Sequence, residues 1–165
     1  MKHATVEQAK LAAVIREAGA GPRLNVLGVT HVYKAMGVET AGHFSLWEAF
    51  VPPGQGAPPH THTHEDEAFY VLDGEIVVEV EVEGSAGPTR AGPGSFFFGP
   101  RGRRHAYRNE GPGVAHLLIF CVPGEGLDRM FGEMHTAAER TGDMPPMDLI
   151  VDIARRHGVT IAPPT

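Results

Sequence analysis

The sequence predicts an all-β fold, an antiparallel sandwich or barrel flanked by short helices, and three observations carry this prediction. Glycine and proline are frequent, at 21 and 14 of 165 residues, which disfavours a helical bundle and favours short strands joined by tight turns. From residue 24 to 122, runs rich in Val, Ile and Phe are each bounded by Gly or Pro. In the clearest run, 75–83, apolar residues alternate with mostly acidic ones, as in a strand with one buried face.

The length of 165 residues suits a single domain with one core. We divide this domain into a helical N-terminal extension over residues 1–23, a β-rich body over 24–122 and a helical C-terminal tail over 123–165. Thr5 and Gln8 form a capping-box pattern that predicts an N-terminal helix over 6–18. After Pro123, apolar residues at helical spacing predict helices over 127–140 and 147–157.

Within the β-rich body, strands are expected over 44–51, 68–72, 75–83, 95–98, 105–109 and 114–121. The dipeptide Asp73-Gly74 predicts a two-residue hairpin between two of them, because Gly accepts the positive φ of a primed turn. Met130, Phe131 and Met134 are expected to pack a helix onto the barrel mouth or onto a second subunit.

Composition excludes several classes of protein. The net charge is -6, so a basic face for nucleic acid is not expected. The single cysteine, Cys121, rules out an intrachain disulfide, and its apolar neighbours predict a buried thiol. The apolar run 11–15 is too short for a signal peptide, and no stretch approaches the roughly 18 apolar residues of a membrane span. We therefore expect a soluble, cytoplasmic protein with no membrane or nucleic-acid partner.

The first motif that carries chemistry is the segment His60-Thr-His62-Thr-His64-Glu-Asp-Glu67. Residues two apart on a strand point to the same face, so His60 and His62 can converge on one ion. Glu67 has the opposite parity, so a reversal between residues 63 and 66 must reset the phase and turn it inward. His64 is expected at the rim, in a supporting or solvent-exposed role. Glu65 and Asp66 are interpreted as surface acids of the turn.

A second motif follows a Gly-Pro corner at residues 99–100 and places His105 as the first inward residue of a strand. His60, His62, Glu67 and His105 together form a mixed N/O donor set that suits Mn, Fe, Ni, Cu or Zn. Such a set leaves one or two positions open for water, dioxygen or substrate. The alternative is a metal-free site in which the histidines hydrogen-bond each other.

These residues resemble the cupin superfamily. Both of its motifs are present without a gap, at Gly54, His60, His62, Glu67 and Gly74, and then at Gly94, Pro100, Gly102, His105 and Asn109. The resemblance implies a cupin-type jelly-roll barrel or double-stranded antiparallel sandwich. It also implies one divalent transition metal ion near the axis, held by the residues that match His60, His62, Glu67 and His105. The sequence leaves the identity of the metal open.

Several residues near the motifs are candidates for a substrate pocket. Phe69 and Val71 share a face with Glu67, and Tyr107 shares one with His105, although core packing explains all three as well. Arg103 could clamp a substrate carboxylate, but a solvated loop is favoured. His116 is interpreted as a core histidine or, second, as a pocket residue.

The leading hypothesis is a quercetinase-like dioxygenase that acts on a small enolisable or phenolic substrate. In this hypothesis Glu67 is both ligand and catalytic base, and burial in a dry barrel raises its pKa. One alternative is a metal-dependent isomerase, lyase or decarboxylase of small carboxylic acids, with Arg103 as the clamp. Another is a small-molecule binding cupin with no catalytic activity. Sheet edges and the apolar tail predict a homodimer.

Overall fold

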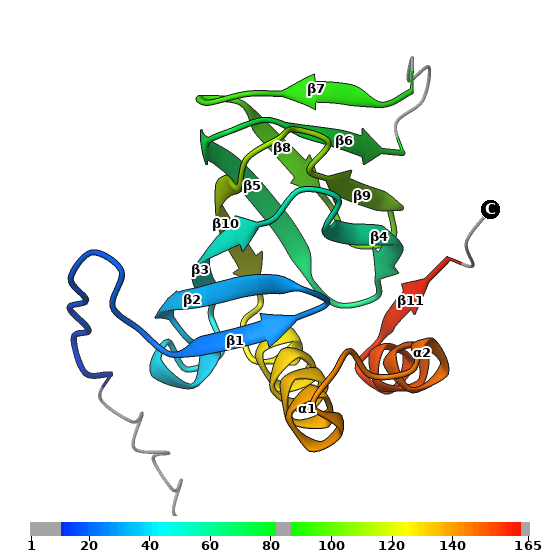
Figure 1. The fold of residues 1–165 in the computed structure, drawn as a ribbon. Coiled ribbons are helices and arrows are strands. Elements are labelled where there is room, and N and C mark those ends of the chain that lie inside the picture. The colour runs from blue at the N-terminus through cyan, green and yellow to red at the C-terminus, as the bar shows by residue number, and fades with distance from the viewer. Residues whose placement is uncertain (1–10, 82–86, 163–165) are drawn as a thin grey trace, which may run out of the picture.

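The computed structural model describes residues 11–81 and 87–162, and within them the chain forms two antiparallel sheets that pack face to face (Figure 1). One sheet has six strands in the order β1-β2-β3-β10-β5-β8, with bounds Arg23–Val26, Val29–Ala35, Ser45–Val51, Ala115–Val122, Asp66–Asp73 and Phe96–Gly99. The other has five strands in the order β11-β4-β9-β6-β7, with bounds Val159–Ile161, Gly56–His62, His105–Arg108, Ile76–Val80 and Thr89–Ala91. Among the described residues the sheets do not close into a barrel, so the predicted jelly-roll fold is confirmed in its sandwich form.

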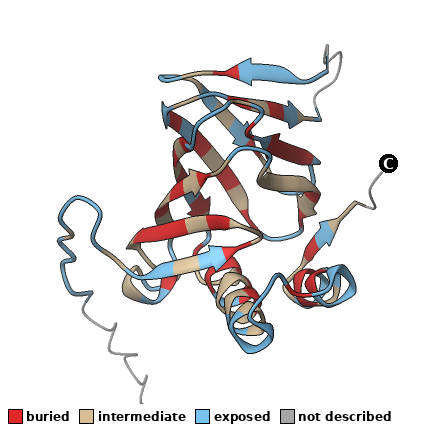
Figure 2. Ribbon diagram, in the orientation of Figure 1, coloured by how far each residue is buried: buried red, intermediate tan, exposed pale blue. Residues whose placement is uncertain are grey.

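The core lies between the two sheets and continues toward the helices. Side chains alternate along the strands, as in β3, where Ser45, Trp47, Ala49 and Val51 are buried and the residues between them are less so. Figure 2 shows the same buried face along the strands and on the inward sides of the helices. Cys121 is buried in this core, as expected.

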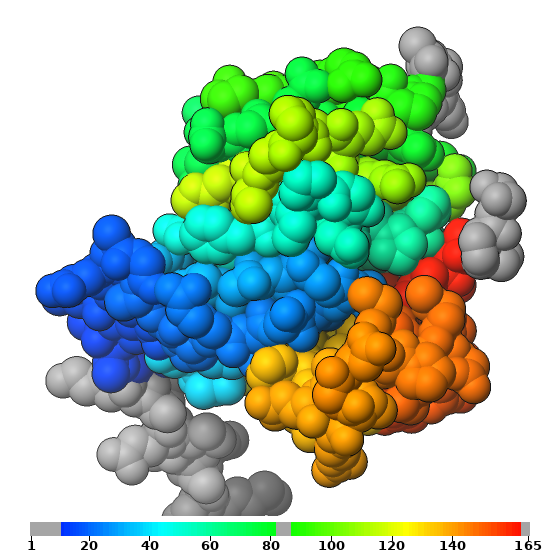
Figure 3. All heavy atoms as spheres, viewed as in Figure 1, coloured from blue at the N-terminus to red at the C-terminus, as the bar shows by residue number. Residues whose placement is uncertain are grey.

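Two helices cover one end of the sandwich. Helix α1 spans Gly126–Thr141 and α2 spans Met147–Arg156, both within one or two residues of the predicted bounds. Each has one apolar face, which buries Met130 and Met134 in α1 and Ile150 and Ile153 in α2. Figure 3 shows the α1–α2 region packed against the β1–β2 hairpin. No helix of the described chain is long and apolar enough to cross a membrane.

The N-terminal helix predicted over 6–18 is wrong where it can be compared. Residues 6–10 lie outside the described residues, and 11–18 have no helical structure. Arg16 holds this segment to the body, because its guanidinium donates to the Lys34 carbonyl at 2.7 Å and to Glu39 at 2.6 Å. In residues 11–18, tertiary contacts therefore override the predicted helix.

The predicted hairpin at Asp73-Gly74 is also wrong. Strand β5 pairs with β10 and β8, whereas β6 pairs with β9 and β7, so the chain passes from one sheet to the other at this point. Gly74 has φ 76°, and a Cβ there would lie 2.8 Å from the Cα of Ala115. Glycine is required at this crossing for both reasons.

The six predicted strands are observed with shifts at their ends. Strand β6 is shorter than the predicted 75–83, since it ends at Val80 and residues 82–83 lie outside the described part of the chain. The strand expected to carry His60 and His62 is observed as β4, whereas strands β1, β2, β7 and β11 and a short 3-10 helix at Gly37–Glu39 were not predicted.

Candidate metal centre

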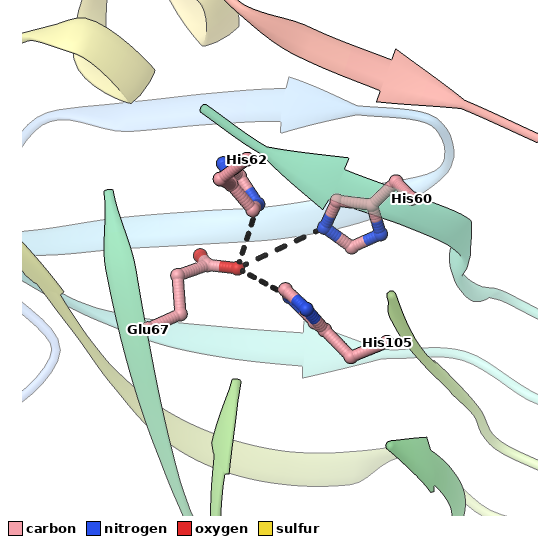
Figure 4. A group of neighbouring side chains, drawn as sticks. All are labelled: His60, His62, Glu67 and His105. Carbon is pink, nitrogen blue, oxygen red and sulfur yellow. Dashed lines mark hydrogen bonds and ion pairs between the residues drawn. The ribbon is translucent and has the colours of Figure 1, made fainter. Parts of the chain in front are cut away.

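Four side chains from three strands meet between the two sheets (Figure 4). His60 and His62 come from β4, and His105 comes from the adjacent strand β9, where it is the register partner of His60. Glu67 comes from β5 of the opposite sheet and faces the three rings. The connection 63–65 carries the chain from one sheet to the other, which is the change of phase that the sequence requires. All four residues are buried.

The Oε2 atom of Glu67 is the centre of the cluster. It lies 3.2 Å from Nε2 of His62, 3.2 Å from Nε2 of His105 and 3.8 Å from Nε2 of His60. All four candidate donor atoms lie within 4.8 Å of one another. Three imidazole nitrogens and one carboxylate oxygen therefore share a volume that one ion can fill.

The far nitrogen of each ring has a neighbour that orients it. Nδ1 of His60 lies 2.7 Å from the carbonyl oxygen of Pro58, and Nδ1 of His105 lies 3.1 Å from that of Arg103. A carbonyl only accepts, so Nδ1 carries the proton in each ring and Nε2 can offer its lone pair to a cation. This donor chemistry fits a transition metal ion.

Glu65 provides the corresponding contact for His62, with Oε2 3.5 Å from Nδ1. The expectation that Glu65 is a surface acid is wrong, because it is only 2% exposed. Asp66 does lie at the surface, where it pairs with Arg101 at 2.7 Å. His64 is exposed, as expected for a residue at the rim.

Charges within the cluster set the protonation of its members. Burial alone would raise the pKa of Glu67, but the charge of His62 and hydrogen bonds from His105, His60 and His62 hold this pKa well below its ordinary value. Burial would lower the pKa of His62, but Glu67 and Glu65 raise it to about 9. Burial lowers the pKa of His60. The expected raised pKa of Glu67 is therefore wrong in this arrangement, since three imidazoles stabilise its charged form.

A small cavity of about 70 Å³ opens beside the cluster. Its wall includes three of the clustered side chains, His60, His62 and Glu67, and is otherwise mainly aromatic and aliphatic. Met130, Phe131 and Met134 of α1 close one side, as expected for a helix over the mouth of the sandwich. The remaining lining residues are Val26, Leu27, His31, Trp47, Ala57, Pro58, Phe69, Tyr107, Ile119, Leu127, Ala154, Val159 and Ile161.

The structure divides the five candidate pocket residues. Phe69 and Tyr107 line the cavity. Val71 is fully buried in the core and does not line it. Arg103 is exposed in the loop before β9, so only its carbonyl reaches the site. His116 is neither a core nor a cavity residue, because it stacks on Phe50 at 4.4 Å and lies 3.4 Å from Glu48.

His31 and Trp47 line the cavity and were not singled out from the sequence. His31 lies in β2, where it is buried together with Val29, Val32 and Tyr33. Three consecutive buried residues do not follow a period of two, so the sequence pattern of this strand does not single out His31.

Comparisons with known proteins agree with this fold and site. Residues 47–122 match the family described as Cupin domain. A curated relative, polyketide synthase CurC of Streptomyces cyaneus, is 32% identical over 84 residues, which cover 51% of this chain and 51% of the relative. The chain thus matches about half the length of that relative.

Two solved structures share the fold. A predicted oxalate decarboxylase from Thermotoga maritima has a TM-score of 0.57 and 21% identity, and the match covers 67% of this chain and 99% of that one. KdgF from Halomonas sp. has a TM-score of 0.51 and 21% identity, with 59% and 81% covered. The family match over residues 47–122, the sandwich fold and the four-residue cluster agree with one another, and the cluster is a candidate metal site.

Proposed function

We propose that this chain is a metal-dependent enzyme that acts on a phenolic or enolisable substrate, such as a β-diketone. The expected reaction is that of a dioxygenase, which uses dioxygen to oxidise the substrate. The observation that carries the proposal is a cluster of four metal-ligating side chains beside a mainly apolar cavity. A substrate with a metal-binding oxygen on an otherwise apolar body suits such a cavity.

A bound divalent ion would lower the pKa of a substrate hydroxyl or enol and stabilise the resulting negative charge. His60, His62 and His105 would hold the ion through Nε2, and Glu67 would hold it through Oε2. Glu67 is also the only carboxylate among the described lining residues, so it is placed to accept the substrate proton. A carboxylate that also holds the ion is a weak base, so the proposed reaction suits a substrate whose proton is already acidic.

The curated relative supports the same substrate class. It is named a polyketide synthase, and polyketide chains carry repeated β-diketone units that close into phenolic rings. A β-dicarbonyl or phenolic substrate for this chain would share that chemistry.

The cavity counts against enzymes of small carboxylic acids or sugar phosphates. Such substrates usually need an arginine or lysine in addition to the metal ion to balance their charge. None of the cavity-lining residues in the described chain is lysine or arginine, and the expected clamp, Arg103, lies outside. A binding protein without catalysis is distinguished from the proposed enzyme by turnover alone.

An outer groove of about 450 Å³ offers room for the rest of a larger substrate. It shares Leu27, Ala57, Pro58 and Tyr107 with the wall of the metal cavity, and Met144 and Met147 also line it. Leu27 belongs to the two-residue turn Leu27-Gly28 between β1 and β2, whose two residues both have positive φ. In the proposed arrangement the reacting end enters the cavity and the remainder lies in the groove.

The test is oxygen uptake by protein reconstituted separately with Mn, Fe, Ni, Cu and Zn. With a flavonol or a β-diketone, at least one metal form should consume oxygen and substrate together, and His105→Ala should abolish this. His43→Ala, at an exposed histidine outside the cluster, is the matched control. Substrate consumption without oxygen would replace the dioxygenase with an oxygen-independent enzyme, and no consumption with any metal would contradict the proposal.

A further inference from the structure

Outside the candidate metal cluster, two buried polar groups of the cavity wall have no hydrogen-bond partner within the described structure. Nδ1 of His31 and Nε1 of Trp47 are completely shielded and lack a hydrogen bond. The two residues are 4% and 1% exposed, and both line the cavity. Neither belongs to the metal-ligating cluster. Buried polar atoms of a folded protein are nearly always hydrogen-bonded, so two orphans on one cavity wall point to a ligand that pairs with them.

The surrounding rings fix the orientation of both groups. Phe131 of α1 stacks obliquely on His31, with centroids 4.9 Å apart, and meets Trp47 edge-on at 5.8 Å. His31 and Trp47 lie 6.2 Å apart on the neighbouring strands β2 and β3. Because both polar atoms are shielded, a ligand reaches them only when neighbouring side chains move aside.

The two groups have complementary hydrogen-bonding roles. The indole N–H of Trp47 only donates. Burial lowers the pKa of His31 to about 4, so its ring is neutral near pH 7 and offers one acceptor nitrogen. A substrate hydroxyl can use both, since its oxygen accepts and its hydrogen donates.

We propose that His31 and Trp47 form a second, metal-independent recognition point that binds a substrate hydroxyl group away from the oxygen held at the metal cluster. The inference rests on the proposed function, because the substrate must then carry at least two oxygens on an apolar body. It narrows the substrate class to polyhydroxylated aromatics and their enolic precursors. His31 and Trp47 are thus specificity-determining residues.

The test compares resorcinol with phenol, which lacks one hydroxyl, by calorimetric titration of the zinc-loaded protein without oxygen. Wild type should bind resorcinol about tenfold more tightly, the ratio that about 1.4 kcal/mol of net hydrogen bonding gives. His31→Leu roughly keeps the packing volume and Trp47→Phe keeps a smaller aromatic ring, and both should reduce this preference to about onefold to threefold, with little change for phenol. Because Trp47 is the only tryptophan of the chain, its fluorescence should respond to resorcinol in wild type.

Two controls separate recognition from folding and from catalysis. His31→Gln retains an acceptor and should keep most of the resorcinol preference, whereas His31→Leu should not. Zinc content and thermal unfolding of each variant show whether the site is intact. Equal binding of the two probes by wild type, or an undiminished preference in Trp47→Phe and His31→Leu, would overturn the proposal. These outcomes do not depend on oxygen uptake, so they are distinguishable from failure of the proposed reaction.

Discussion

Glu65 lies with its Oε2 atom 3.5 Å from Nδ1 of His62, on the side of the imidazole that faces away from the metal-ligating cluster. This buried carboxylate fixes the ring so that Nε2 points at Glu67. Gly126, at the start of α1, leaves the space that Glu65 occupies, since a side chain there would collide with the carboxylate. The helical tail thereby contributes to the geometry of the site.

Removing the Glu65 carboxylate should therefore weaken metal binding. We expect Glu65→Ala to lower zinc affinity by about 10–100-fold, the usual effect of losing such an outer contact. Competition titration against a chelator measures this change. Asp66→Ala, which removes the exposed contacts of Asp66 with the guanidinium and the backbone N–H of Arg101, is the control and should bind zinc as wild type does. Equal affinity in Glu65→Ala and wild type would show that Glu65 does not orient His62.

Stability should fall in mild acid because of His31. Burial lowers its pKa from 6.5 to about 4, so the unfolded chain takes up a proton between these pH values and the folded chain does not. The free energy of unfolding should decrease from pH 6.5 to pH 4, by on the order of 3 kcal/mol from this residue. Urea unfolding at several pH values measures the slope. His31→Leu should flatten it, and an unchanged slope in that variant would contradict the assignment.

The crossing between the sheets at Gly74 should tolerate no side chain. Gly74→Ala must adopt a positive φ and push against the backbone of Ala115, so we expect a loss of at least about 1 kcal/mol in stability. Gly132→Ala in α1 is the matched control, since no atom lies within 4 Å of its added methyl group. It should leave stability unchanged or raise it by up to about 1 kcal/mol. Chemical unfolding measures the stability of both variants. Equal stabilities would contradict the claim that the crossing requires glycine at position 74.

The structure offers a candidate interface for the homodimer that the sequence predicts. Exposed aromatic side chains gather on the outer face of the adjacent strands β10, β5 and β8, with Phe96 64% and Phe98 48% exposed beside Tyr70 and Phe120. Contiguous apolar patches of this kind mark association sites, and a two-fold dimer uses the same patch twice. Light scattering should give the mass of two chains for wild type and of one for Phe96→Ser combined with Phe98→Ser. A one-chain mass for wild type would contradict the dimer.

Much of the site could be predicted from the sequence because its spacing is local. His60 and His62 share a strand, and Gly and Pro mark the turn before His105, so parity together with one change of phase before Glu67 turns all four candidate ligands inward. The cavity wall could not be predicted in the same way. His31 and Trp47 line it from strands β2 and β3, which lie outside the two sequence motifs. Phe69 and Val71 share one face of β5, so parity could not show that Phe69 lines the cavity and Val71 lies in the core.

The wrong or missing predictions about the fold also concern contacts between residues that are far apart in the sequence. Strand β11 is only three residues long, and its pairing with β4 beside His60 and His62 is a contact over about a hundred residues of sequence that no local pattern encodes. A glycine with positive φ serves a crossing between sheets as well as a hairpin, so Gly74 could not reveal which one the chain uses. Glu65 was misassigned because its burial depends on Gly126 of the distant helix.

The central claim is that His60, His62, Glu67 and His105 hold one metal ion, and metal analysis of protein purified without an affinity tag tests it most directly. Elemental analysis by mass spectrometry should find about one transition metal ion per chain in wild type. Glu67→Ala combined with His105→Ala should retain less than about a tenth of that amount, while His43→Ala retains all of it. The same metal content in the double variant as in wild type would contradict the claim.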